Sequence, residues 1–258
     1  MNMKGFRSAI RTLTILPCRG GENENLSDSL YWFVPTGLLM GLILFLFGSL
    51  WQWLLPTPWP LGGAVLMVAL EIILTRGLHM DGLADWADSI GGFGRQRRLA
   101  IMKDVPVGTF GSLALILDVI LRVAVYSRLI STGSLIWIPA VSVISRDVMV
   151  ALITTLPYAR TGEGMARPFL AGASREHWIL SHCLCLIVCL LFGPLGVALF
   201  FLAWGFTMIY GNRCQKQFGG ITGDLLGTAN ELVSLLLLLF CAAWGDQIMA
   251  ITGWFWLR

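Results

Sequence analysis

Long apolar runs alternate with short polar segments from about residue 31 to the end of the chain. Most runs reach or approach the roughly 20 residues that a helix needs to cross the hydrocarbon core of a bilayer. The runs 178–192 and 195–210 are separated only by Gly193-Pro194, so they also fit one kinked or re-entrant unit. The pattern predicts an all-α, polytopic transmembrane helical bundle of about seven spans, with six to eight compatible, in one domain over residues 1–258. The predicted spans are 31–55, 61–78, 109–130, 135–156, 178–192, 195–210 and 228–251.

Composition strengthens the membrane assignment, because 56% of the residues are hydrophobic and only 13% are charged. A soluble domain carries about 25% charged residues. The formal net charge of +3 gives no indication of nucleic-acid binding. The six cysteines form no CxxC pair, which argues against a zinc site or a disulfide framework. The first apolar run begins too late for a secretory signal peptide, and the lipid bilayer is the expected environment.

Basic residues gather in polar segments that the span pattern places on one side of the membrane. Within residues 1–30, the stretch 6–16 is expected to form a short amphipathic helix at the membrane surface. The positive-inside rule predicts that residues 1–30 and the segments 89–108, 157–177 and 211–227 are cytoplasmic. The basic residues that decide this orientation are Lys4, Arg7, Arg11, Arg19, Arg95, Arg97, Arg98, Lys103, Arg160, Arg167, Arg175, Arg213 and Lys216.

An acidic stretch, residues 79–88, follows the second apolar run. Its three carboxylates, Asp81, Asp85 and Asp88, are spaced i, i+4 and i+7, and on a helix they share one face. Like charges at this spacing repel one another, and a hard divalent cation such as Mg²⁺ binds carboxylate oxygens and removes the repulsion. The stretch therefore predicts a metal site, the alternative being a solvated acidic helix end.

Two further polar segments carry candidate chemistry. Lys103-Asp104 precedes glycines at the mouth of a span and suits a phosphate-neutralising cation beside a metal ligand, although a surface ion pair explains it equally well. The stretch 219–227 crowds glycines around Asp224, which indicates a loop wrapped on an anion, or simply a flexible turn. Arg160, in the segment after the fourth span, is a candidate phosphate contact.

Some ionisable residues fall inside predicted spans, where each costs roughly 2.5–3.5 kcal/mol and usually faces a cavity or a partner. Arg146-Asp147 could serve a site or compensate each other as neighbours. Asp118 and Arg122 form an i, i+4 pair for which we favour a structural role. His79 joins the carboxylate face only if the chain bends near Gly82, since it lies about 160° from Asp81 on an unbroken helix.

Taken in chain order, these stretches resemble one family, the adenosylcobinamide-GDP ribazoletransferases or cobalamin synthases. The acidic stretch and the Gly-Gly-x-Thr-Gly-Asp loop, in this order and in a membrane context, carry most of the resemblance. The matching stretches are 13–17, 33–37, 79–88, 102–111, Arg146, 157–160 and 219–227.

The resemblance implies a Mg²⁺-dependent enzyme of the bacterial cytoplasmic (inner) membrane with its active face in the cytoplasm, and it leaves a homo-oligomer open. The enzyme would transfer the adenosylcobinamide-phosphate unit of adenosylcobinamide-GDP to α-ribazole or its 5′-phosphate, releasing GMP and completing adenosylcobalamin or its 5′-phosphate. On the matching positions, the metal and catalytic residues would be Asp81, Asp85, Asp88, Asp104 and Asp224, and the substrate contacts Lys103, Arg146, Arg160, Gly220, Thr222, Gly223 and His79.

Two other functions remain open from the sequence. A CDP-alcohol phosphotransferase-like enzyme of phospholipid synthesis also uses clustered aspartates, but its pattern expects an arginine soon after the first Asp-Gly, which is absent here. A proton- or cation-coupled transporter would use Arg146-Asp147, Glu71 and Asp246 as relays. Most carboxylates cluster at one predicted membrane face, which favours surface chemistry over transport.

Overall fold

The computed structural model describes residues 3–21, 25–104, 106–162 and 164–252. Regular secondary structure in this part of the chain is helical, apart from one isolated bridge between Tyr158 and Ile221, so the all-α prediction is confirmed. The helices are α1 (Met3–Leu13), η1 (Leu26–Trp32), α2 (Phe33–Leu54), α3 (Pro60–Thr75), α4 (Leu78–Ser89), α5 (Arg95–Ile101), α6 (Thr109–Thr132), α7 (Trp137–Thr155), α8 (Arg167–Ala171), α9 (Arg175–Leu191), α10 (Gly193–Phe218) and α11 (Gly223–Thr252).

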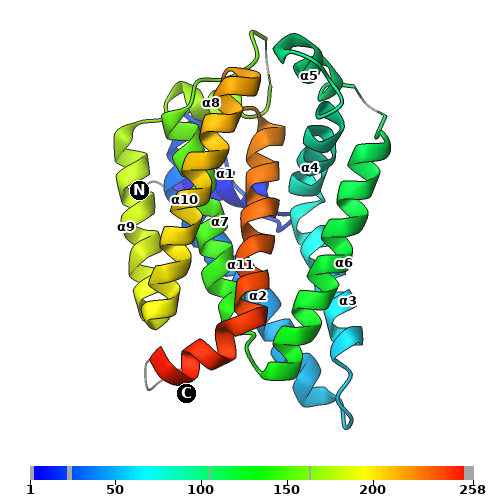
Figure 1. Cartoon of the computed structure of the whole chain (residues 1–258). Helices are drawn as coiled ribbons and strands as arrows, with labels where there is room; N and C mark the ends of the chain where they lie inside the picture. The colour runs from blue at the N-terminus through cyan, green and yellow to red at the C-terminus, as the bar shows by residue number, and fades with distance from the viewer. Residues whose placement is uncertain (1–2, 22–24, 105, 163, 253–258) are drawn as a thin grey trace.

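Each predicted span coincides with one of the long helices, which run along a common direction (Figure 1). Residues 178–210 form two antiparallel helices, α9 and α10, because Gly193 adopts φ 78° and reverses the chain between them. By length and composition, four helices of the described chain can cross a membrane, and five if α3 and α4 are counted as one broken crossing. The count of seven spans stays a prediction.

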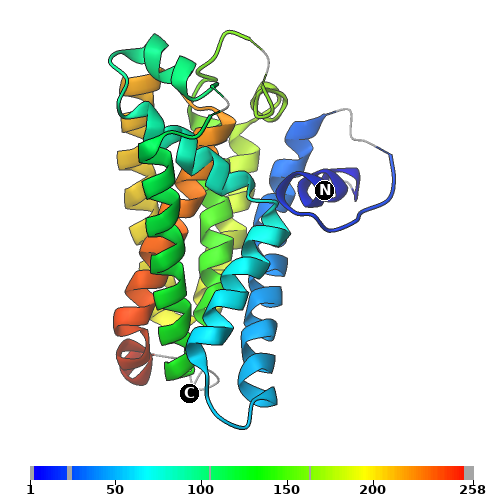
Figure 2. The ribbon, with the colours of Figure 1, turned by 90° about the vertical axis from the view of Figure 1, so that its right-hand side faces the viewer.

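Helix α7 lies inside the bundle, and α2 packs closely against it (Figures 1 and 2). Two glycines one turn apart on α2 allow this approach. A Cβ on Gly37 would lie 2.5 Å from the carbonyl oxygen of Ser142, and one on Gly41 would lie 2.6 Å from Cα of Pro139. Small residues at this spacing let helix backbones approach in a membrane, where packing replaces the hydrophobic effect as the driving force. Helix α11 packs on the other side of α7 and also against α4.

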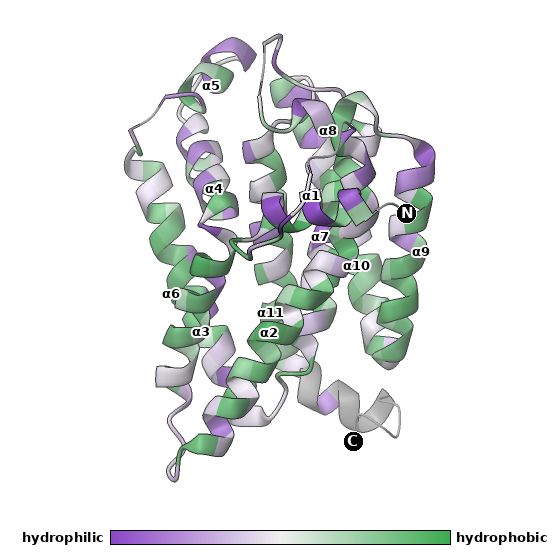
Figure 3. Ribbon diagram, turned by 180° about the vertical axis from the view of Figure 1, so that it is seen from behind, coloured by the Kyte–Doolittle hydropathy of each residue, from purple (hydrophilic) through white to green (hydrophobic). Residues whose placement is uncertain are grey.

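One end of the bundle is polar, and it carries α4, α5 and α8 (Figure 3). Helix α4 is bent by 91° from α3, at a break where Arg76 and Gly77 adopt φ 56° and 65°. The amphipathic α1 lies across the bundle beside this break, where the Ile15 amide donates to the Leu74 carbonyl at 2.7 Å and Arg76 Nη2 donates to the Arg11 carbonyl at 2.6 Å. Since α4 carries three carboxylates beyond the break, we count it with the polar end and outside the spanning segments.

Candidate active site

Helix α4 presents its carboxylates on one face, as the spacing predicts. Asp81 is exposed and Asp85 and Asp88 are partly buried, whereas His79 on the opposite side is buried. The helix continues unbroken through Gly82, and the bend occurs earlier, at Arg76-Gly77. His79 therefore does not join the carboxylate face, and its expected place in the site is corrected.

The start of α11 lies directly against α4 because Gly82 has no side chain. A Cβ at this position would lie 2.5 Å from the carbonyl oxygen of Asp224. Thr228 Oγ1 donates to the Gly82 carbonyl at 2.9 Å and fastens the two helices together. Two segments separated by about 140 residues thus bring Asp224 beside the carboxylate face of α4.

The glycine-rich loop before α11 is held by the segment that contains Arg160. The Ala159 amide donates to the Ile221 carbonyl at 2.9 Å, and the Ile221 amide donates to the Pro157 carbonyl at 2.9 Å. Gly220, at φ 147°, is required here, because a Cβ would lie 2.1 Å from the Pro157 carbonyl oxygen. The bridge fixes where the loop enters α11.

Thr222 directly precedes α11, and Asp224 lies in the first turn of that helix. Thr222 Oγ1 accepts from the Leu225 amide at 3.3 Å and donates to Asp224 Oδ2 at 3.3 Å. Gly223 lies between them with space around it, since the nearest atom to a Cβ there would be 3.8 Å away. The loop therefore serves the site by orienting the Asp224 carboxylate.

Arg160 links three parts of the site. Its Nη2 donates to Asp224 Oδ2 at 2.8 Å and to the Met102 carbonyl at 3.2 Å. Lys103 and Asp104 follow Met102 and are exposed at the edge of the site. Neither of these two side chains forms an ion pair with α4 or α11 in the described chain, so Arg160 brings their loop close without bringing them into contact.

Arg95 also belongs to this region, although the sequence singled out only the basic stretch around it. Arg95 Nη2 donates to the Ala159 carbonyl at 2.9 Å. Its guanidinium lies against the loop glycine Gly219, where a Cβ would be 2.4 Å from Arg95 Cζ. Arg95 of α5 thus places its guanidinium beside the bridge between Tyr158 and Ile221.

Asp88 is engaged differently from the other two aspartates of α4. Its Oδ2 accepts from the Gly108 amide at 2.7 Å, and its Oδ1 accepts from the Gly111 amide at 2.8 Å. These amides lie at the start of α6, where a carboxylate satisfies unpaired N–H groups and the positive end of the helix dipole. Asp88 therefore fastens α6 to α4, and this capping role was missed in the sequence.

The carboxylates of the site carry more negative charge than the neighbouring Arg160 balances. Burial raises the pKa of Asp85 to about 7, with further contributions from Asp224, Asp81 and Asp88, while Arg160 opposes the shift. Arg160 is shared between Asp224 and the Met102 carbonyl and does not balance all these carboxylates. The site is therefore suited to a positively charged ligand.

The residues fit a hard divalent cation in their chemistry. Asp81, Asp85 and Asp224 offer carboxylate oxygens, the ligands that Mg²⁺ prefers, and substrate phosphates commonly complete its shell. In the described part of the chain, no three His, Cys, Asp or Glu side chains stand together as a formed metal cage. The carboxylates lie near one another around Gly82, and they would have to move closer together to coordinate one cation.

Arg146 lies deeper in the bundle than the carboxylate face. It is buried on α7, where its Nη1 donates to Ser145 Oγ at 2.9 Å and its Nη2 contacts Met40 Sδ at 3.4 Å. The predicted phosphate contact of Arg146 stays a prediction, and the guanidinium lies buried in this structure. Its neighbour Asp147 points elsewhere, since successive helical residues project about 100° apart, so the two do not compensate each other.

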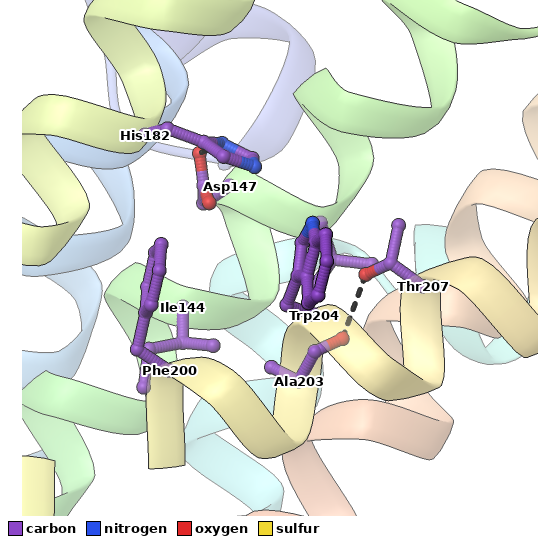
Figure 4. A pocket seen from close by; sticks show the side chains of 8 residues that line it. Ile144, Asp147, His182, Phe200, Ala203, Trp204 and Thr207 are labelled. Atoms are coloured by element: carbon purple, nitrogen blue, oxygen red, sulfur yellow. Dashed lines mark hydrogen bonds and ion pairs between the residues drawn. The ribbon is translucent and has the colours of Figure 1, made fainter. Parts of the chain in front are cut away.

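Asp147 instead meets α9 at a small pocket between α7, α9 and α10 (Figure 4). Its Oδ1 accepts from Ser181 Oγ at 2.5 Å and lies 2.9 Å from His182 Nδ1. The packing of α7 against α9 brings Asp147 and His182 together, although they lie far apart in the chain. Phe200, Trp204 and other side chains of α10 close the pocket, which shares no lining residue with the carboxylate site.

Comparisons with known proteins identify the family. A family model described as cobalamin-5-phosphate synthase matches residues 5–242. The chain belongs to this family. It is 38% identical over 240 residues to an adenosylcobinamide-GDP ribazoletransferase of Chlorobium phaeobacteroides, covering 91% of this chain and 95% of that protein.

Two further relatives of the same name cover even more of the chain. The protein of Chlorobaculum parvum is 39% identical over 256 residues, or 94% of this chain and 96% of its own length. The protein of Chlorobaculum tepidum is 39% identical over 268 residues, or 98% of each chain. No solved structure matches the chain. Family membership favours the cobalamin synthase reading over both alternatives that the sequence left open.

Proposed function

We propose that this protein joins the adenosylcobinamide-phosphate unit of adenosylcobinamide-GDP to α-ribazole or its 5′-phosphate. The observation that carries the proposal is the family match over residues 5–242, which includes every loop that builds the carboxylate site. The relatives are named for this substrate and this transfer. An anionic diphosphate needs cations at its binding site, and a carboxylate group that attracts Mg²⁺ meets that need.

The proposed reaction is a substitution at phosphorus. The 5′-hydroxyl oxygen of α-ribazole attacks the phosphorus attached to cobinamide, the bond from that phosphorus to the bridging oxygen breaks, and GMP leaves with the bridging oxygen. Asp81, Asp85 and Asp224 would hold Mg²⁺, which when bound neutralises charge on the diphosphate. Arg160 and Lys103 lie at the edge of the same site, where their charges attract and orient the nucleotide.

Asp85 is our candidate for the group that takes the hydroxyl proton. No hydrogen bond commits the Asp85 carboxylate in the described part of the chain, so one of its oxygens stays available to accept the proton beside the cation. Asp224 is less free to act, since its Oδ2 already accepts bonds from Arg160 and Thr222. Asp88 is committed to the start of α6.

We further propose that the polar end faces the cytoplasm of a bacterial cell and that the protein lies in its cytoplasmic membrane. The basic residues of α5 and of the loops lie at the same end as the carboxylate site. The positive-inside rule assigns such an end to the cytoplasm, from which a nucleotide-activated substrate can reach the site.

The test is turnover by the purified protein in liposomes, given adenosylcobinamide-GDP, α-ribazole and Mg²⁺. We expect GMP release that requires Mg²⁺ and is lost in Asp85→Asn. The exposed Glu176→Gln on α9 serves as a matched acid-to-amide control and keeps full activity. Absence of GMP release above the Asp85→Asn background would sink the proposal.

The metal needs its own readout, separate from turnover. We expect Mg²⁺ binding in isothermal titration calorimetry by the wild type, and a loss of binding in the double variant Asp81→Asn, Asp85→Asn. Binding that survives the double variant would show that other residues hold the ion. Release of CMP from CDP-diacylglycerol by the same preparation would point instead to the phospholipid alternative.

A further inference from the structure

A second group of carboxylates surrounds one arginine inside the bundle, away from the carboxylate site. Arg122 on α6 donates through Nε to Asp118 Oδ2 at 2.8 Å and through Nη2 to Glu231 Oε2 at 2.5 Å. Its Nη1 lies 3.4 Å from Glu71 Oε1, and Glu71 also accepts from the Tyr126 hydroxyl at 2.7 Å. Three helices, α3, α6 and α11, thus direct carboxylates at one buried guanidinium.

The charges of this cluster do not balance if every carboxylate is ionised. Glu71, Asp118 and Glu231 carry three negative charges. Arg122 supplies one positive charge in contact with them, and the buried Arg146 of α7 supplies the second through space, without an ion pair to any of the three in the described chain. One negative charge would remain in an apolar interior, where an isolated charge is costly and is usually neutralised by a proton.

Histidine does not supply the missing charge. His79 on α4 is buried beside the cluster, and Arg146 and Arg122 are the charged groups that act on it. Its Nε2 has no hydrogen-bond partner. A protonated ring would place a third cation next to two guanidiniums with no acceptor for its Nε2 proton, so His79 is neutral here.

Asn230 marks where the missing proton lies. Its side chain is 3% exposed, and its Oδ1 is a buried oxygen without a partner, while its Nδ2 lies 3.1 Å from Glu231 Oε1. A 180° rotation of the amide keeps its shape and places Oδ1 at the Glu231 oxygen, where it can accept a carboxyl O–H. Glu231 Oε2 still accepts from Arg122 in this arrangement.

We propose that Glu231 binds a proton at neutral pH, held on Oε1 toward Asn230, and that this cluster is a membrane-embedded proton-binding site. The titratable and charged groups facing it are Glu71 from α3, His79 from α4, Asp118, Arg122 and Tyr126 from α6, and Arg146 from α7. With the proton bound, two carboxylates balance two guanidiniums. Loss of the proton leaves a net negative charge two turns below Asp224 on the same helix.

A pH dependence of stability follows, with a definite sign. The folded protein binds a proton at Glu231 under conditions in which an unfolded glutamate is ionised. Stability is therefore greatest below the pKa of an unfolded glutamate, and it falls as the pH rises from there to the pH at which the folded protein releases the proton. Glu231→Gln, which resembles the protonated side chain in shape and charge, should lack the part of this fall that Glu231 contributes.

Infrared spectroscopy and thermal unfolding of the purified full-length protein test the proposal together. The spectra are compared in an Asp85→Asn background, because Asp85 also holds a proton near pH 7. In this background we expect a protonated-carboxyl C=O band at neutral pH that shifts in D₂O and is lost when Glu231→Gln is added. Glu231→Gln should change the Tm by no more than about 2–4 °C, the shift typical of one ordinary interaction in a chain of this size. Asp118→Asn, the matched acid-to-amide change in the same cluster, should keep the band and lower the Tm by more.

Several outcomes would overturn the proposal. In the Asp85→Asn background, absence of the band, or its survival when Glu231→Gln is added, means that Glu231 holds no proton. An equal fall in Tm with rising pH for the wild type and for Glu231→Gln means the same. A Tm that rises when choline is replaced by Na⁺ in the buffer would identify a metal cation as the balancing charge. If Asp118→Asn does not fold, the band in the Asp85→Asn background, with and without Glu231→Gln, still decides.

Discussion

Helix α11 contributes a carboxylate to two very different groups within its first turns. Asp224 joins Asp81 and Asp85 at the polar end, where Arg160 is the cation that opposes the negative charge. Glu231 joins Asp118 and Glu71 inside the bundle, where Arg122 contacts all three carboxylates. The same residue type is left open to a ligand in one group and enclosed by partners in the other.

The difference separates a site that is open to a ligand from a cluster that is enclosed within the bundle. Carboxylates that face one another without cations raise the energy of the free protein, and a ligand that removes the repulsion gains that energy on binding. Carboxylates gathered around a buried guanidinium have already found their partner, and removal of the guanidinium leaves buried charge behind. Substitutions should therefore affect activity in the first group and folding in the second.

The largest effect is expected from Arg122→Met. This change strands the carboxylates of Asp118 and Glu71, and breaking a buried ion pair typically costs about 3–5 kcal/mol. Thermal or denaturant unfolding in detergent measures the loss, and we expect low yield or a strongly reduced Tm. The exposed Arg213→Met on α10 is the matched control. An Arg122→Met protein as stable as that control would show that the cluster contributes nothing to folding.

Asp85→Asn should have the opposite profile. It removes a proposed metal ligand and base, and we expect GMP release to fall at least about 100-fold. Stability should stay the same or rise, because the change removes charge repulsion from Asp224 and Asp81. Turnover and unfolding on the same preparation check both halves. A variant that loses stability in parallel with activity would place Asp85 with the structural group.

Gly82→Ala tests how closely α4 and α11 must approach. A Cβ would lie 2.5 Å from the carbonyl oxygen of Asp224, so the helices must separate. Overpacking of this kind costs about 1–3 kcal/mol, and here it should also reduce turnover by displacing Asp224 from Asp85. Gly205→Ala on α10 is the control, because a Cβ there meets nothing within 4 Å. Equal behaviour of the two variants would contradict the close approach.

Arg160→Gln should lower activity with little effect on stability. The Arg160–Asp224 pair is partly exposed, with side-chain exposures of 21% and 19%, and ion pairs of this kind contribute about 0–1 kcal/mol. The loss of the Met102 and Asp224 contacts should reduce turnover by about 10–100-fold. A rise in KM larger than the fall in kcat would indicate that Arg160 chiefly binds the nucleotide.

The smallest expected effect is a pH dependence of stability from Asp85. Its pKa is about 7 in the folded protein, against an ordinary value of 3.8 for an aspartate side chain. The folded state therefore holds more protons between these values, and stability falls as the pH rises across that window. Partial exposure of Asp85 keeps the effect small. Asp85→Asn should flatten the Tm profile over this range, and an unchanged profile would assign the dependence to another group.

The sequence alone determined the features that depend on local spacing. Apolar runs long enough to cross a bilayer predicted the positions of the long helices, and the i, i+4, i+7 spacing placed Asp81, Asp85 and Asp88 on one face. The i, i+4 spacing likewise predicted the Asp118–Arg122 pair, which forms at 2.8 Å. Periodicity suffices here because helix geometry fixes which neighbours in sequence are neighbours in space.

Only the tertiary structure decided which partner each polar side chain meets. Asp88 accepts from α6 rather than facing a ligand, Arg146 is buried near Met40, and Asp147 pairs with His182 of α9. The unbroken α4 keeps His79 out of the site. Arg95 donates to the Ala159 carbonyl beside the bridge between the two loops, a contact that no local sequence pattern predicts. These outcomes depend on where glycines such as Gly82 let helices approach, and that is set by packing between segments far apart in the chain.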